Sequence, residues 1–329
     1  MMRKKLNVIL GGLAGLGLLL CACTEQDALE ADGLIRLGAK ADMYTRASVN
    51  DLAGLSAVGK KVGVYGVVTE HADATSQLLT DEWGTNLLMS NVRTSGIDAS
   101  TGVLSWEGAY AYPLEEGRFV KFCVYHPYAA AGTTGDNYVE ASAKSSPVLH
   151  FKLTGAEDVM WVQPVVGSRT LSPAPLVFDH RLTQLRFRLT DDEGNFADTQ
   201  VTGLVFNGVN TVSTLNLETG KLGVWGTPSD GISFPLHAPV AITGTSDAPQ
   251  NLPGEVMLQP GLAEFKLTVK TDKKGDFPNV VIRPTGGENT FAAGRSYLVT
   301  LKFRERTPVV LSAVVTPWIM DGTGEGTVD

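Results

Sequence analysis

Short runs in which apolar and polar residues alternate restrict the fold of this chain more than any other feature. In residues 185–189, three apolar side chains fall on one face and two arginines on the other. A period of two is typical of extended strands, whose successive side chains point to opposite faces. Long stretches of helical periodicity are nearly absent, so the pattern predicts an all-β chain. The other alternating runs are residues 119–125, 201–206, 265–269, 280–283, 297–303 and 309–316.

Turn-forming residues separate these runs and divide the chain. Short strands joined by turns at this spacing are typical of β-sandwiches, and no strand–helix alternation indicates a doubly wound sheet. Residues 167–175 are rich in Gly, Ser and Pro, which favours a boundary there. We predict two tandem sandwiches, residues 47–175 and 176–329, each of ordinary single-domain size.

The first residues have the pattern of an export signal. Three basic residues are followed by an apolar run over 6–20, which is shorter than the about 20 residues of a spanning helix. The run ends in Leu20-Cys21-Ala22-Cys23, which resembles the lipobox of bacterial lipoproteins. We predict a signal peptide over 1–22 and a lipid on Cys23, which would anchor the chain in the outer membrane. An ordinary signal peptide with two incidental cysteines is the alternative.

Composition excludes several classes of function. The net charge is −8 and no basic cluster follows the signal, which argues against a nucleic-acid partner. Beyond the signal region Cys123 is the only cysteine, so neither an intramolecular disulfide nor a cysteine-based zinc site is expected. Cys123 lies in an apolar strand and is expected to line the core.

The titratable residues give no pattern of a catalytic or metal site. The five histidines, His71, His126, His150, His180 and His237, show no metal-ligand spacing. Asp179-His180 has no accompanying nucleophile motif, so we expect a structural histidine. The acidic turn 191–195 lacks the Gly and Glu of a calcium loop. The sequence therefore predicts neither an enzyme nor a bound cofactor or metal.

Four segments together resemble the Bacteroidales fimbrillin family of FimA-like fimbrial subunits. They are 106–113 leading to 120–128, the strand 177–187 with Phe178 and His180, the turn 291–297, and the closing 314–318 with Trp318. The resemblance implies two Greek-key, transthyretin-like sandwiches. It also implies export as a lipoprotein, trimming by an Arg-specific protease at the cell surface, and polymerisation by strand exchange.

Residues 23–46 are interpreted as a lipidated propeptide that contains the first strand. Ile35, Leu37, Ala39, Ala41 and Met43 fall on one face, with charged residues opposite, and Arg46-Ala47 follows directly. The family resemblance implies cleavage after Arg46 and loss of this strand. The alternative is a surface arginine in a loop.

Loss of the first strand would leave an apolar groove and unpaired backbone groups, which a strand from a neighbouring subunit could fill. The candidate donor row is Val309, Leu311, Ala313 and Val315. The same residues could instead form the last strand of the second sandwich, paired with 297–303, and the two roles are compatible if the strand swings out. A head-to-tail contact of this kind propagates into a filament.

These observations predict a structural stalk or tip subunit of a cell-surface fimbria that supports adhesion and biofilm formation. Its partners would be other fimbrial subunits, the outer membrane through the lipid, and a receptor on a host or bacterial cell. The alternative is a monomeric glycan-binding surface lipoprotein of a nutrient-uptake system. Five tryptophans could line a sugar site, although in a sandwich they are more often core residues: Trp83, Trp106, Trp161, Trp225 and Trp318.

Overall fold

The computed structural model describes residues 32–40, 54, 56–57, 61–78, 82–226, 228, 231–234, 236–285 and 288–304, and the backbone of 311–316. Several predicted sites lie outside these residues: the signal peptide, Cys23, Ala41, Met43, Arg46, Ala47 and Val309. Within the described part, no helix has the length and apolar character needed to cross a bilayer.

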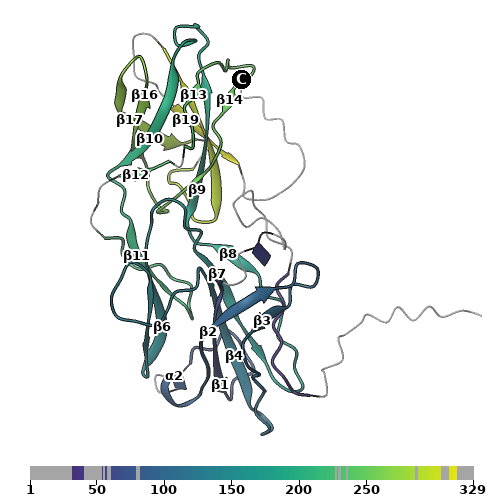
Figure 1. The fold of residues 1–329 in the computed structure, drawn as a ribbon. Helices are drawn as coiled ribbons and strands as arrows, with labels where there is room; N and C mark the ends of the chain where they lie inside the picture. The colour runs from purple at the N-terminus through teal and green to yellow at the C-terminus, as the bar shows by residue number, and fades with distance from the viewer. Residues whose placement is uncertain are drawn as a thin grey trace, which may run out of the picture.

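One end of the molecule is built on a six-stranded antiparallel sheet (Figure 1). Its order is β3-β2-β1-β4-β7-β8, and the short helix α2 (Glu82–Thr85) precedes β2. The strands are β1 (Gly63–Thr69), β2 (Leu87–Ile97), β3 (Leu104–Trp106), β4 (Phe119–His126), β7 (Met160–Gly167) and β8 (Phe178–His180).

The two faces of this sheet bury different side chains, which explains why β4 is apolar along nearly its whole length. Phe122 and Val124 belong to a first core on one face, whereas Cys123 and Tyr125 belong to a second core on the other. The first core consists of Ile35, Leu37, Ala39, Val62, Val64, Met89, Ile97, Leu104, Tyr112, Val120, Phe122, Val124, Met160, Val162, Val165, Leu176 and Phe178.

A three-stranded sheet contributes to the second core at the same end of the molecule. Its order is β11-β6-β5, with β5 (Tyr138–Ser142), β6 (Ser145–Lys152) and β11 (Val212–Asn216). Strand β11 comes from the second half of the sequence, and β8 also pairs across the predicted boundary at 175/176. The division into two domains stays a prediction, and these pairings show that two strands of the second half, β8 and β11, pair with strands of the first half.

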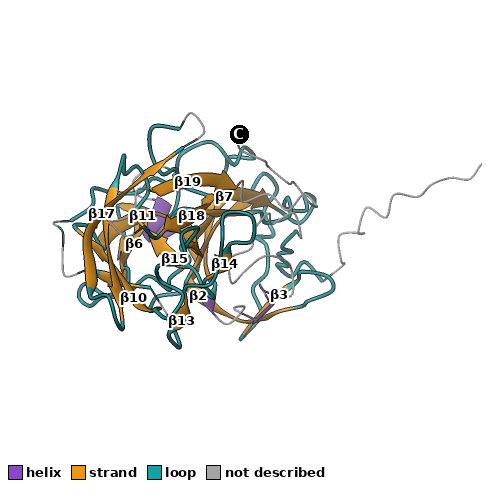
Figure 2. Cartoon of the chain, turned by 90° about the horizontal axis from the view of Figure 1, so that it is seen from above, coloured by secondary structure: helices purple, strands orange, loops and turns teal. Residues whose placement is uncertain are grey.

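The opposite end of the molecule is a ten-stranded sheet (Figures 1 and 2). Its strands contribute most of the remaining residues of the second core. The path is β12-β10-β16-β17-β19-β18-β9-β14, with β13 on β10 and β15 on β9. Its strands are β9 (Thr183–Thr190), β10 (Gln200–Asn207), β12 (Ile232–Ser233), β13 (Val240–Ala241), β14 (Gln250–Asn251), β15 (Val256–Leu258), β16 (Phe265–Thr271), β17 (Asp276–Pro284), β18 (Arg295–Lys302) and β19 (Leu311–Thr316).

We call the part built on the six-stranded and three-stranded sheets the first lobe, and the part built on the ten-stranded sheet the second lobe. Alternation along β9 shows how the sequence pattern builds the second lobe. Leu185, Phe187 and Leu189 are buried, whereas Arg186 and Arg188 are only half-buried. Phe187 packs against Phe206 and Phe234 of the same core, with ring centroids 5.9 and 5.3 Å away. The predicted all-β sandwich fold is confirmed.

Candidate functional site

The segment 32–40 covers the first core of the six-stranded sheet. Ile35, Leu37 and Ala39 are 4%, 1% and 6% exposed, and all three belong to that core. They are the described members of the apolar row expected from the sequence. The segment makes isolated bridges rather than one continuous strand, at Leu34, Gly38 and Ala39.

Backbone hydrogen bonds attach the segment to the stretch that contains β3. Ile35 N donates to Tyr110 O at 2.8 Å, and Ala39 N donates to Gly102 O at 2.9 Å. In return, the segment accepts bonds from two amides of this stretch: Tyr112 N donates to Gly33 O at 3.0 Å, and Leu104 N donates to Leu37 O at 2.9 Å.

The other side of the segment is bonded to Leu176, two residues before β8. Leu176 N donates to Gly38 O at 2.8 Å, and Lys40 N donates to Leu176 O at 3.0 Å. Strands β3 and β8 are the two edges of the six-stranded sheet. The segment therefore bridges both edges and closes the sheet around the first core.

Gly102 allows the segment to approach this closely. Its φ is +75°, and a Cβ atom placed on it would stand 2.0 Å from the carbonyl oxygen of Ala39. A residue with a side chain there would be strained and would push the segment outward.

The outward face of the segment is charged. Arg36 forms an ion pair with Asp32 at 2.7 Å, and both side chains are exposed. The hydrogen bond from Arg36 and another from the Leu34 amide lower the pKa of Asp32 to about 2. The apolar face inward and the charged face outward match the alternation read from the sequence.

The described candidate donor residues, Leu311, Ala313 and Val315, lie in the ten-stranded sheet. Strand β19 pairs antiparallel with β18, where Val315 is opposite Tyr297 and Ala313 opposite Val299. It also pairs in parallel with β17, where Leu311 is opposite Ile282. The antiparallel partner is the one the sequence suggested. The parallel partner had no local signal, because the intervening β18 separates the two strands along the chain.

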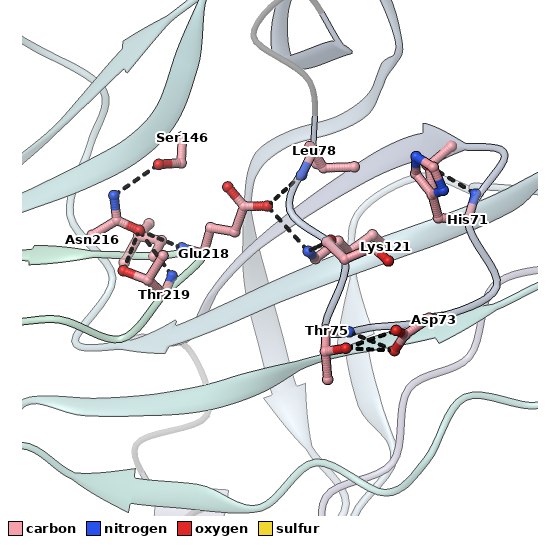
Figure 3. A network of polar contacts seen from close by, with 12 residues as sticks. His71, Asp73, Thr75, Leu78, Lys121, Ser146, Asn216, Glu218 and Thr219 are labelled. Atoms are coloured by element: carbon pink, nitrogen blue, oxygen red, sulfur yellow. Dashed lines mark hydrogen bonds and ion pairs between the residues drawn. The ribbon is translucent and has the colours of Figure 1, made fainter.

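Sequence reasoning missed a buried ion pair that attaches the turn after β11 to β4 (Figure 3). Lys121 Nζ lies 3.1 Å from Glu218 Oε1, with side-chain exposures of 2% and 8%. Lys121 also donates to Ser76 O at 2.6 Å, and Glu218 accepts from Leu78 N at 2.8 Å. A lysine inside an otherwise apolar strand was the available signal, since a fully buried lysine requires a partner.

Further contacts hold the same turn, so β11 is fixed in the first lobe. Trp161 Nε1 donates to Leu217 O at 2.9 Å, and Arg181 donates to Gly220 O at 2.6 Å. Gly220 has a φ of +68°, and a Cβ atom there would stand 2.6 Å from the Trp161 ring.

Two of the histidines, His126 and His180, are buried. His180 Nδ1 lies 2.7 Å from Asp158 Oδ1 in a buried pair. Burial lowers the pKa of His126 to about 4, despite the nearby Asp158 carboxylate. Burial likewise raises the pKa of the Cys123 thiol to about 12. Among the described residues, no three His, Cys, Asp or Glu side chains gather as metal ligands.

A polar cleft of about 700 Å³ lies beside β2. Ser90 and residues 92–95 form one wall, and Glu107 and Tyr110 form another. Trp106 packs edge-on against Tyr110, with ring centroids 6.4 Å apart. The other described tryptophans belong to the second core or pack against it.

Comparison with known proteins identifies the family. The sequence profile of the fimbrillin-like proteins matches residues 45–318. This chain belongs to the fimbrillin-like family. No curated protein matched its sequence.

Solved structures resemble this fimbrillin-like protein over most of its length. A "putative cell adhesion protein" from Bacteroides uniformis is 18% identical and has a TM-score of 0.54, covering 87% of this chain and 100% of its own. A fimbrial assembly protein from Parabacteroides distasonis is 10% identical with a TM-score of 0.41, covering 86% and 96%. At such identities, the first likeness supports the shared fold.

Proposed function

We propose that this protein is a structural subunit, stalk or tip, of a cell-surface fimbria. In this proposal, segment 32–40 keeps the precursor monomeric until cleavage after Arg46. A strand from a second copy then takes its place. One observation carries the proposal: a short segment before Arg46 supplies both the apolar side chains and the backbone partners that close the first core. Family membership supports it, as does the name of the Bacteroides uniformis structure.

Loss of the segment would leave a groove that needs an occupant. Burying Ile35 and Leu37 contributes about 1.5–3 kcal/mol each. The amides of Leu104, Tyr112 and Leu176 would also lose their acceptors. Each amide left unpaired in a buried site costs about 1–3 kcal/mol. A strand added from another subunit restores both contributions at once.

The proposed donor is the last strand, β19. In the precursor it fills a place between β17 and β18, so donation requires it to leave that sheet. Donor and acceptor lie in opposite lobes of one chain (Figure 1). Such a head-to-tail contact does not close on itself and continues into a filament.

The lipid on Cys23 would deliver the precursor to the outer membrane. Cleavage after Arg46 would then separate the subunit from its anchor. The assembled filament would support adhesion and biofilm formation through a receptor on another cell. The role proposed is structural rather than catalytic.

The test is cleavage of the purified full chain with an Arg-specific protease, followed by electrophoresis without boiling. We expect a ladder of polymers from the wild type and a monomer from Arg46→Lys, which keeps the charge but resists the protease. Arg36→Lys is the matched control and should leave the ladder intact. A ladder from Arg46→Lys, or cleaved wild type that stays monomeric, would contradict the proposal.

The cleft beside β2 supports a second candidate function, carbohydrate binding. Its walls offer a half-buried aromatic ring, Tyr110, and the charged side chains Arg93 and Glu107. Aromatic faces and polar groups of this kind suit sugar rings. A glycan array with wild type and Tyr110→Ala would test it. Binding that disappears in the variant would favour this function, and no binding by the wild type would reject it.

A further inference from the structure

We propose that the incoming strand enters the groove in one direction and one register. Val309 takes the place of Ile35, Leu311 that of Leu37, and Ala313 that of Ala39. This inference rests on the proposed function, because residues 307–314 of a second copy must replace residues 33–40. It attributes the specificity of assembly to the three sites in the groove that hold the side chains of Ile35, Leu37 and Ala39 in the precursor, because these sites differ in size.

The three acceptor sites follow the order large, large, small. Ile35 and Leu37 are almost fully buried. Ala39 is only 6% exposed although its side chain is a single methyl group, so its neighbours close directly over the Cβ atom. The backbone of Gly102 also lies close to the carbonyl oxygen of Ala39. Because protein interiors are close-packed, we expect the third site to disfavour a side chain larger than alanine.

The donor row has the same order of sizes when it is read in the same direction. Val309 is one methylene smaller than Ile35, and the next two residues, Leu311 and Ala313, are identical to those they replace. Ser312 would stand at the place of Gly38, where a Cβ atom meets nothing within 4 Å. Substitutions that nearly conserve volume are the ones a packed core tolerates best.

The backbone of the donor also fits this register. Within segment 32–40, the amides that bond to the sheet belong to Ile35, Ala39 and Lys40. Their counterparts are Val309, Ala313 and Val314, none of which is proline. Pro308 would stand at Leu34, whose amide bonds only to the Asp32 side chain. The missing N–H of proline therefore removes no bond to the groove.

Other registers do not match the three sites. A shift of two residues in either direction places Val315 or Leu311 in the alanine site. A shift of one residue turns the apolar row outward. A donor strand in the reversed direction would run parallel to residues 102–112. It could not repeat the antiparallel pattern of hydrogen bonds that segment 32–40 makes with these residues. Overfilled and underfilled sites both destabilise a core.

The outward face of the donor is more apolar than that of the segment it replaces. The exposed Arg36 and Lys40 would be exchanged for Val310 and Val314. Two exposed apolar residues flank the groove: Val103, opposite Gly38, is 38% exposed, and Val177, next to Leu176, is 42% exposed. The donor therefore gains apolar contacts that the resident segment lacks, which favours exchange.

Disulfide trapping tests the register. Gly38 and Val103 are directly opposite each other in an antiparallel bridge. The backbone hydrogen bonds of this bridge join their chain neighbours instead, Ala39 N to Gly102 O and Leu104 N to Leu37 O. Gly38 and Val103 therefore form a non-hydrogen-bonded pair. Such antiparallel pairs place Cα atoms about 4.5 Å apart, within disulfide range. Gly38→Cys with Val103→Cys in one uncleaved chain is the geometric control and should close an intramolecular disulfide. The native Cys123 is buried.

The experiment mixes full-length subunits carrying Val103→Cys with subunits carrying Ser312→Cys, cleaves both and oxidises them. We expect covalent dimers on a non-reducing gel. Partners with Val310→Cys or Val314→Cys report shifts of two residues. The pair Ala111→Cys and Thr316→Cys reports reversal, because Ala111 faces Leu34 in the same way.

The result that overturns the register is a polymer that cross-links through one of these alternative pairs, or through none of the pairs. If cleaved wild type forms no polymer, the proposed function fails and the register fails with it. A polymer without the Ser312→Cys cross-link leaves the fimbrial function standing and rejects the register alone.

Discussion

Leu37 is the side chain of the N-terminal segment that the first core buries most completely, at 1% exposure. We predict that Leu37→Ala in the uncleaved chain lowers the free energy of unfolding by about 2–5 kcal/mol, because it removes buried contacts and leaves a cavity. Urea unfolding measures this. Leu114→Ala is the matched control, since Leu114 is 81% exposed and its loss should change stability by less than about 0.5 kcal/mol. Equal effects of the two variants would contradict this account of the segment.

His126 makes the stability of the fold depend on pH. Burial holds its pKa at about 4, below the value of 6.5 expected for the unfolded chain. Between these values the unfolded state binds the proton and the folded state does not, so stability is lost as the pH falls. A pKa difference of one corresponds to about 1.4 kcal/mol, so the free energy of unfolding should fall by about 3 kcal/mol between about pH 7 and about pH 4.

The variant His126→Asn should remove this part of the pH dependence. Unfolding free energies at about pH 7 and about pH 4 measure the difference, since the titration falls between these values. The same substitution at His237, which is exposed, serves as control and should follow the wild type. A His126→Asn profile as steep as that of the wild type would show that other groups carry the acid sensitivity.

At the scale of elements, the contact between segment 32–40 and the stretch before β3 depends on Gly102. An alanine at its φ of +75° costs about 1–2 kcal/mol in backbone strain alone. Gly117 has a φ of +76° and open space around a Cβ atom, so Gly117→Ala shares the strain without a clash. We predict that Gly102→Ala costs about 1–3 kcal/mol more than Gly117→Ala, because the new Cβ atom meets Ala39 O.

Amide exchange at Leu104 measures the effect on the element itself, since this amide bonds to Leu37 O. Gly102→Ala should accelerate its exchange, and Gly117→Ala should leave it near the wild-type rate. Equal rates in both variants would mean that the close approach at Gly102 does not control the attachment of the segment.

Local patterns in the sequence predicted which face of a strand is buried better than they predicted which strands pair with each other. The alternation in β9 and in segment 32–40 gave the buried side chains, because a period of two follows from strand geometry alone. The pairing of β11 with β6 and the parallel contact of β19 with β17 were not predicted. These pairings depend on residues far apart in the sequence, and no local pattern encodes them. Lys121 was read as part of an apolar strand, because its partner Glu218 is 97 residues away.

At the scale of the whole molecule, the two lobes are joined by more than one crossing of the chain. Strand β11 belongs to the second half of the sequence but pairs with β6 of the first half. The Lys121–Glu218 ion pair and the hydrogen bond from Trp161 to Leu217 O hold the turn that follows β11. The second core runs through both lobes. The proposed acceptor groove at one end and the proposed donor strand at the other are therefore joined through one continuous core, as the proposed filament subunit would require.

The amides of Leu104, Tyr112 and Leu176 give the most direct test of the central claim, because all three bond to carbonyls of segment 32–40. Their hydrogen exchange is to be compared in the precursor, in freshly cleaved monomer and in polymer, with mass spectrometry showing whether the segment is still present. The account predicts slow exchange in the precursor, fast exchange in the cleaved monomer, and slow exchange again in a polymer that lacks residues 32–40. A polymer that retains the segment, or one in which the three amides exchange freely, would contradict it.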